Sequence, residues 1–351
     1  MVIPEQRSGQ PDFSSGLLAS DEVHASDGTV STGTLPPAER VEALLREAYR
    51  RYLPLGEGVV ADHIPSLSQA DPALFGLSIC GVDGTLTSSG DSDYRFSIQS
   101  ISKVFVFALV CQELGHDEIS RIVGVNSTGL PFNSVMAMEL HDGEPRNPMV
   151  NAGALATTSL VPGDTSAAKW EFIQAGLSRF AGHPLELDID VYESESATNQ
   201  RNLAIARLLE SYGRLRFDPN QTTDVYTKQC SLLASAKDLA VMAATLADGG
   251  VNPITHEKVV DAAVCRDALA VMATSGLYEF SGDWLFEIGV PAKSGISGGI
   301  LTVAPGKGGL GTFSPPLDPA GNSVRGQRAA RYLSGALGLD IFASRPWSAA
   351  P

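Results

Sequence analysis

Residues 96–107 read FSIQSISKVFVF, a polar stretch that runs directly into an apolar, helix-like segment. If a helix begins near Ser100, the three-residue spacing places the Ser100 hydroxyl and the Lys103 amine on one face, one turn apart. Serine is a weak nucleophile at neutral pH unless a base takes its proton, and lysine can do this only if its pKa is lowered from about 10.4. Burial and the positive end of the helix would both lower that pKa, so a nucleophile and its base could meet here.

A second Ser-x-x-Lys sequence, Ser166 to Lys169, offers a comparison. It follows a Pro-Gly-Asp-Thr run at residues 162–165 and is typical of the N-cap and first turn of a surface helix. The first copy instead leads into a segment that is apolar on nearly all sides, which is typical of a buried helix. Because a buried lysine needs a reason, we interpret the first copy as a chemical site and the second as structural.

Composition narrows the class of protein. At 351 residues with 43% hydrophobic content, the chain can bury the core of one large domain or of two closely joined ones. Its formal net charge of −15 argues against nucleic-acid and anionic-membrane partners, because both repel an acidic protein. The four cysteines stand far apart, without a Cys-x-x-Cys pair or a histidine cluster. We therefore expect buried free thiols of a reducing compartment, and no metal site.

The first 35 or so residues are rich in Ser, Gly, Asp and Thr and contain few large apolar residues. They lack a basic start followed by an apolar core, so we predict a disordered tail over residues 1–36 and no signal peptide. No uninterrupted apolar run is long enough to cross a bilayer. We expect a cytoplasmic protein.

The spacing of apolar residues predicts one catalytic domain over residues 37–345 with two halves. A sheet half is expected from about 37–116 and 284–345, and a mainly helical half from about 117–283. Strands near both ends of the chain predict one sheet built from both, with the helical half inserted. The expected helices are 41–53, 100–114, 152–160, 167–180, 202–212, 222–233, 237–247, 259–273 and 326–337, and the expected strands are 75–82, 86–88, 299–304 and 309–313.

The tripeptide Lys293-Ser294-Gly295 precedes a glycine-rich run, as suits the edge of a strand where a backbone approaches a ligand. A Lys-Ser/Thr-Gly sequence downstream of Ser-x-x-Lys is the combination of active-serine β-lactamases and penicillin-binding proteins. The two motifs in this order favour that fold. A β-turn with an exposed lysine would explain either motif taken alone.

Longer motifs follow the same order along the chain: NPMVNAGA at 147–154, Ser194-Glu195 followed by Arg201-Asn202, Cys230-Ser231, MAATLA at 242–247, PAKSG at 291–295, SPPLD at 314–318 and GNSV at 321–324. With these motifs the chain resembles the serine-dependent glutaminase family from about Ala61 to Gly326. The resemblance implies an α+β, β-lactamase/transpeptidase-like fold, an antiparallel sheet flanked by helices. It also implies hydrolysis of L-glutamine to L-glutamate and ammonia without a metal or organic cofactor, by a homo-oligomer, either a dimer or a tetramer.

The resemblance implies a chemical role for five residues. Ser100 is the nucleophile and Lys103 its general base, with Tyr226 and Tyr278 close to the reacting centre. The backbone N–H groups of Ser100 and Ile296 form the oxyanion hole. These roles suit the chemistry, because attack on an amide creates an oxyanion that needs two fixed donors. The leaving ammonia needs a proton, which a tyrosine hydroxyl can relay.

The substrate explains the polar residues of the motifs. Glutamine carries an α-ammonium and an α-carboxylate, so its pocket needs one buried acid and several neutral donors. The matching family positions are Asn151, Glu195, Asn202 and Tyr226, with Lys293-Ser294-Gly295 as a supporting motif. Taken alone, Glu195 would be interpreted as a solvated helix residue and Asn202 as a cap. Only the joint match reverses those interpretations.

Two other functions stay open from the sequence. One is a β-lactamase or peptidase that also forms an acyl-serine, and the other is a non-catalytic module that senses a ligand with the same fold. A β-lactamase working outside the membrane needs an export signal, which we do not expect here. A sensor would be expected to lose Lys103, the tyrosines or the oxyanion glycines, all of which are present.

The chain departs from the family pattern at His63. Where the family usually has Ala-Asp-Tyr-Ile-Pro, residues 61–65 read ADHIP, so His63 stands at the position of a substrate-contacting tyrosine. Imidazole can still donate a hydrogen bond, but from a shorter side chain, and it becomes charged near neutral pH. The alternative is that His63 only fills the same space.

We predict that His63→Tyr strengthens substrate binding and flattens the acid limb of the pH dependence of kcat/KM. A protonated imidazole would place a positive charge beside a pocket that must hold the substrate's ammonium, so binding should weaken as the pH falls through about 6.5. Steady-state kinetics from pH 5 to 8 measure this. If variant and parent share the same acid limb and the same KM, His63 is only a spacer.

Overall fold

The computed structural model describes residues 33–62 and 64–344. Two sequence predictions therefore fall outside it, namely most of the tail expected at 1–36 and the position of His63. Within the described ranges, no helix combines the length and the apolar character that a membrane span requires.

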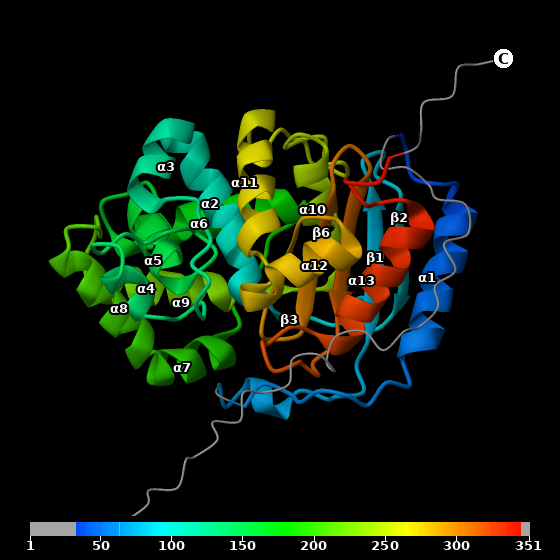
Figure 1. Cartoon of the computed structure of the whole chain (residues 1–351), viewed down its shortest axis with the longest axis horizontal. Coiled ribbons are helices and arrows are strands. Elements are labelled where there is room, and N and C mark those ends of the chain that lie inside the picture. Colours follow the sequence, from blue (N-terminus) through cyan, green and yellow to red (C-terminus); the bar gives the residue numbers. More distant parts are fainter. Residues whose placement is uncertain (1–32, 63, 345–351) are drawn as a thin grey trace, which may run out of the picture.

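One antiparallel sheet contains strands from both ends of the chain (Figure 1). Its order is β2-β1-β7-β6-β5, so the early hairpin pairs with the late strands through β1 and β7. This arrangement confirms the prediction of a single sheet built from both ends. The strands are β1 Gly76–Gly81, β2 Leu86–Gly90, β5 Ala292–Ser294, β6 Gly299–Ala304 and β7 Gly308–Phe313.

Both faces of the sheet are covered by helices, and for that reason β1, β6 and β7 are buried along their whole length. One face of the sheet shares an apolar cluster with three helices, α1 (Ala38–Tyr52), α12 (Ser281–Ile288) and α13 (Val324–Leu337). Helix α10 (Ala236–Ala247) covers the other face. It lies against the glycines of β7, where a Cβ added to Gly311 would stand 2.1 Å from a carbonyl of α10. The glycines thus permit a close helix–sheet approach.

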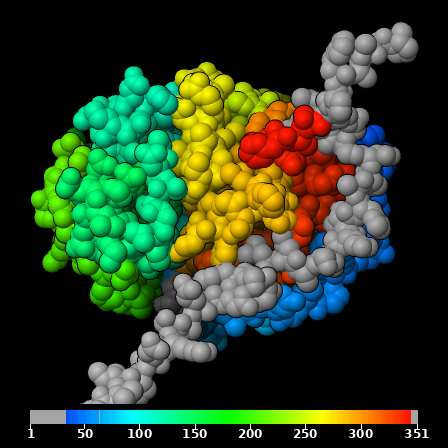
Figure 2. All heavy atoms as spheres, in the orientation of Figure 1, coloured from blue at the N-terminus to red at the C-terminus, as the bar shows by residue number. Residues whose placement is uncertain are grey.

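The remaining helices form the other side of the molecule, with α11 and α12 (yellow in Figure 2) at the surface between that side and α13. The helical patterns predicted between 117 and 283 are all present as helices, with ends that shift by a few residues. The helices not yet given are α2 Ser102–Leu114, α3 His116–Val123, α4 Met136–Glu139, α5 Asn151–Leu160, α6 Ser166–Ala181, α7 Ile189–Thr198, α8 Gln200–Ser211, α9 Pro219–Cys230 and α11 Ala262–Ser275, with 3₁₀ turns η2 Leu67–Gln69, η3 Gln99–Ile101 and η4 Tyr278–Phe280.

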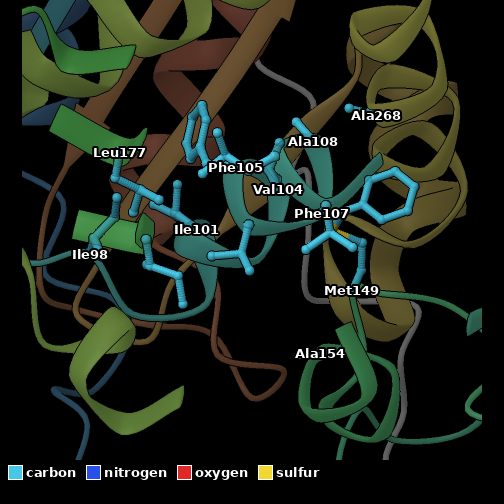
Figure 3. Packing of buried hydrophobic residues seen from close by; sticks show 14 of the residues in the cluster. Ile98, Ile101, Val104, Phe105, Phe107, Ala108, Met149, Ala154, Leu177 and Ala268 are labelled. Carbon is cyan, nitrogen blue, oxygen red and sulfur yellow. The ribbon is translucent and has the colours of Figure 1, made fainter. Parts of the chain in front are cut away.

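Helix α2 is buried on every side, as its apolar sequence predicts. All ten residues from Ser102 to Cys111 are buried. Figure 3 shows its side chains pointing in opposite directions, with Phe105 and Phe107 on different sides of the helix. The Phe105 ring packs at 4.8 Å from that of Phe180 on α6. The helix that carries Lys103 is therefore held by a core that surrounds it.

Three local predictions need correction. The helix does not begin at Ser100, because residues 99–101 form the 3₁₀ turn η3 and α2 starts at Ser102. The segment expected to be helical to residue 233 ends at Cys230, since Leu233 belongs to the short strand β4 (Leu233–Ala234), which pairs with β3 (Phe96–Ser97). This pairing matters for the site, because β3 leads directly into η3.

The third correction concerns the second Ser-x-x-Lys sequence. The N-cap of α6 is Thr165, whose side chain accepts a hydrogen bond from the Ala168 N–H, and Ser166 is the first helical residue. Lys169 is buried, not on the surface, and its amine donates hydrogen bonds to the carbonyls of Ser159 and Val161. The role of Lys169 is structural, as predicted. It donates hydrogen bonds to backbone carbonyls at the C-terminal end of α5, which have no partner within that helix.

Candidate active site

Ser100 lies in η3, between a strand and a buried helix that hold it from both sides. The Ile98 N–H donates to the Leu232 carbonyl at 2.7 Å, which fixes the chain before the turn. The Ser102 hydroxyl donates to the Gln99 carbonyl at 2.8 Å, which fixes the turn itself. Gln99 has φ of +51°, a left-handed conformation that side-chain-bearing residues seldom adopt. Such conformations cluster at functional sites.

Lys103 is only 1% exposed, one turn after Ser100. Its amine donates to the Asn151 side-chain oxygen at 2.7 Å and to the Met149 carbonyl at 3.3 Å. Burial lowers the pKa of Lys103 to about 8, and the nearby carboxyl of Glu195 opposes this shift. An amine with this pKa is substantially neutral in mildly alkaline solution, so it can accept a proton.

Tyr278 lies next to Ser100, and its own φ of +54° is also left-handed. Its hydroxyl forms a side-chain hydrogen bond with Ser100 and donates to the Ser294 carbonyl at 3.4 Å. Burial raises the pKa of Tyr278 to about 12, so the hydroxyl keeps its proton at neutral pH. The structure therefore pairs the Ser100 hydroxyl with a tyrosine, while Lys103 bonds to Asn151.

The Lys293-Ser294-Gly295 motif lies behind these groups, on and just after the edge strand β5. The Lys293 amine donates to the Ser294 carbonyl at 2.8 Å and stands 4.3 Å from the centre of the Tyr278 ring. Burial, reinforced by the charge of Lys103, holds the pKa of Lys293 well below its usual value. At Gly295, an added Cβ would stand 2.9 Å from the Ile98 carbonyl, so this position leaves no room for a side chain beside η3.

A cavity of about 170 Å³ opens beside Ser100. It brings together residues that are far apart in the chain, including six of the predicted substrate and oxyanion residues. Its lining is Ile64, Gln99, Ser100, Phe132, Asn133, Asn151, Glu195, Thr198, Asn199, Arg201, Asn202, Tyr226 and Ile296. Lys103, Tyr278 and the Lys293 motif lie outside this lining. A larger hollow, of about 520 Å³, lies around Val59 and Asp318 and contains none of the predicted site residues.

Glu195 is the acidic side chain among the residues that line the cavity, and it is only 7% exposed. Burial raises its pKa to about 7, while a hydrogen bond from Gln99 and the charge of Lys103 act in the opposite direction. It is carried by α7, a helix with little apolar surface of its own. Among residues 33–62 and 64–344 this buried carboxyl accepts a hydrogen bond from the neutral Gln99 amide and forms no ion pair, which suits it to a cationic ligand.

The polar side chains continue into a network. Asn151, the first residue of α5, accepts from Lys103 and donates to the Asn202 side-chain oxygen at 2.9 Å. Tyr226 is buried against the same cavity, and burial raises its pKa well above the usual value. Through Asn151, the network links Lys103 to Asn202, which also lines the cavity.

Several lining residues were not predicted from the sequence. Arg201 donates twice to the Asn133 carbonyl, at 3.0 and 2.8 Å, and so anchors the loop that carries Phe132 to α8. Arg201 belongs to one of the motifs quoted above, which is a signal that could have identified it. Phe132 and Asn133 have no such signal, because their loop has neither a regular spacing nor a recognisable motif.

Comparison with known proteins adds a family to this geometry. A family profile described as Glutaminase matches residues 58–342. Glutaminase 2 of Yersinia pestis is 58% identical over 319 residues, which are 91% of this chain and 94% of that protein. The chain belongs to the glutaminase family. The glutaminase of Brucella canis is 47% identical over 308 residues, covering 88% of this chain and 97% of that protein.

Solved structures of glutaminases share the fold. A probable glutaminase, ybaS, is 45% identical with a TM-score of 0.87, and the match covers 88% of this chain and 100% of that one. The structure of Mglu in its tris and glutamate form is 38% identical with a TM-score of 0.83, covering 87% and 68%. The predicted family and β-lactamase-like fold are confirmed. Of the functions that the sequence left open, the predicted one is confirmed: the chain is a glutaminase, an enzyme that hydrolyses glutamine to glutamate.

Proposed function

We propose that this glutaminase cleaves the side-chain amide of L-glutamine through an acyl-serine intermediate on Ser100. The observation that carries the proposal is the position of Ser100 at the cavity wall, one helical turn before a buried Lys103 whose pKa is about 8. Neutral Lys103 takes the proton from the hydroxyl as the Ser100 oxygen attacks the amide carbon. An acyl-serine forms when the carbon–nitrogen bond breaks.

The proton then has to reach the leaving nitrogen. Tyr278 is hydrogen-bonded with Ser100 and keeps its proton at neutral pH, so it can relay the proton from Lys103 to the departing ammonia. In the second half of the reaction, Lys103 takes a proton from water while the water oxygen attacks the acyl carbon. Glutamate leaves, and Ser100 regains its proton.

The oxyanion of each tetrahedral intermediate would be stabilised by the N–H groups of Ser100 and Ile296. Both residues line the cavity, and Ile296 directly follows the constrained Gly295. Across residues 33–62 and 64–344, neither N–H donates to a backbone acceptor. Two backbone donors at the cavity that have no backbone acceptor among these residues are what such an intermediate needs.

Recognition of the substrate would fall to the polar side chains that line the cavity. Glu195 would pair with the α-ammonium, while Asn151, Asn202 and Tyr226 supply neutral hydrogen-bonding groups around it. His63 remains a predicted contact, and its neighbour Ile64 lines the cavity. Lys293 would act behind the site, through its contact with the Tyr278 ring.

We also propose a homo-oligomer, a dimer or a tetramer, and a cytoplasmic location. The first proposal is supported only by the family resemblance. The second is supported by the four cysteines, Cys80, Cys111, Cys230 and Cys265, which are all free and buried. Free thiols are typical of a reducing compartment.

Ser100→Ala should abolish ammonia release from glutamine while the fold stays intact, because it removes the nucleophile but only a small hydroxyl. Lys103→Ala should be nearly as damaging. The measurement is ammonia release with circular dichroism as a check of folding, and hydrolysis of a chromogenic β-lactam in parallel tests the alternative activity. Ser166→Ala is the matched control and should keep full activity. Loss of activity in Ser166→Ala but not in Ser100→Ala would overturn the assignment.

Glu195→Gln should raise KM far more than it lowers kcat. The carboxylate would pair with an α-ammonium that is present equally in the ground state and the transition state, so its loss weakens both to the same extent. Steady-state kinetics with glutamine measure the two constants separately. An unchanged KM with a much reduced kcat would place Glu195 in the chemistry and not in recognition.

The pH dependence of kcat/KM should rise from acid towards alkaline pH in two steps. Glu195 must lose its proton, with a pKa of about 7, to attract the ammonium, and Lys103 must lose its proton, with a pKa of about 8, to act as base. Both requirements favour higher pH, so activity is lost as the pH falls through 8 and then 7. In Glu195→Gln, the acid-side slope of log kcat/KM should be smaller by about one. An unchanged slope would show that Glu195 does not titrate in this range.

A further inference from the structure

Gln99, the residue immediately before the nucleophile, has a backbone conformation that its chemistry disfavours. Its φ is +51°, where the Cβ of an L-residue crowds the neighbouring carbonyl. We infer that Gln99 is a positioning residue that aims Ser100, by means of a side chain tied to the substrate-binding acid. The inference rests on the proposed role of Ser100 as the nucleophile.

The side chain of Gln99 is held through its amide nitrogen, which makes two hydrogen bonds. It is 2% exposed, and its nitrogen donates to the Ser97 hydroxyl at 3.2 Å and to the Glu195 carboxyl at 3.3 Å. Its backbone carbonyl accepts from the Ser102 hydroxyl at 2.8 Å. A left-handed glutamine persists only where its surroundings over-determine it, and these three bonds do so.

The Lys293-Ser294-Gly295 motif completes this support. A Cβ at Gly295 would stand 3.3 Å from the Cβ of Gln99 and 2.9 Å from the Ile98 carbonyl. The glycine of the motif therefore leaves the space in which the left-handed turn lies. The turn in turn decides where the Ser100 N–H and hydroxyl are placed, because both follow the Gln99 ψ and the next peptide plane.

Gln99 also joins two parts of the site. Its amide contacts Glu195, which would hold the α-ammonium, while its backbone precedes the atom that would attack the amide at the other end of glutamine. A ligand that binds Glu195 would therefore affect the Gln99 side chain, which we infer to hold Ser100 in place. Loss of the Gln99 side chain should affect both binding, through Glu195, and chemistry, through the backbone.

Two variants separate these effects. Gln99→Ala and Gln99→Gly lose the same hydrogen bonds, so KM should rise to a similar degree in both. Alanine keeps the penalty for positive φ, whereas glycine adopts this conformation freely. We expect kcat to fall at least tenfold in Gln99→Ala and to recover at least fivefold in Gln99→Gly relative to Gln99→Ala, in kinetics with glutamine.

The matched control is His256, an exposed residue with φ of +60° in the turn between α10 and α11. His256→Ala and His256→Gly should differ in melting temperature but not in kcat or KM. If Gln99→Gly is no faster than Gln99→Ala, or if Gln99→Ala keeps the parent kcat, the inference is wrong. Ser100→Ala measured alongside distinguishes the two levels, since activity retained there would instead refute the proposed nucleophile.

Discussion

The buried amine of Lys103, one helical turn after the proposed nucleophile Ser100, is the constraint on which the rest of this structure depends. An ammonium removed from water without a charge partner is so costly that the group gives up its proton more readily instead. Helix α2 places Lys103 in such surroundings, because the helix is enclosed on all sides by other helices and the sheet. The same apolar core that stabilises the fold therefore also lowers the pKa of Lys103. Packing and chemistry are one property of this helix.

To act as the proposed base, Lys103 needs partners that accept a hydrogen bond without supplying a full negative charge. Asn151 and the Met149 carbonyl meet this need, since they orient the amine while leaving its pKa low. A carboxylate at the position of Asn151 would stabilise the ammonium form and raise the pKa again. Glu195 is close enough to oppose the shift, but burial remains the larger effect. The carboxyl of Glu195 thus stays available for the proposed contact with the substrate, while the amide of Asn151 orients Lys103.

The sheet contributes by bringing the end of the chain to its beginning. Because β7 pairs with β1, the edge strand β5 lies where Lys293, Ser294 and Gly295 can meet η3 and Tyr278. Two residues with positive φ lie next to Ser100. Gln99 precedes it in the chain, and Tyr278 forms a side-chain hydrogen bond with it. Each costs about 1–3 kcal/mol on general grounds, and the rigid sheet and buried helix supply the rigidity that holds such strain. The fold therefore tolerates strain at these two positions only because the sheet and the buried helix around them are rigid.

The local sequence determined much of this protein by itself. Apolar spacing predicted α1, the buried α2 and the strands of both ends, since periodicity records which face of an element is buried. The order of the motifs predicted the family, and with it six of the residues that line the cavity. The tertiary structure decided what local spacing does not encode. The residues around Glu195 in the sequence do not show that this side chain of the polar helix α7 is buried. They also do not show that the Gln99 amide donates a hydrogen bond to it. Likewise, Lys169 is interpreted from its surroundings as exposed, yet it satisfies carbonyls of a neighbouring helix. Burial of a charged side chain depends on which distant segments come to cover it, and only the assembled fold determines that.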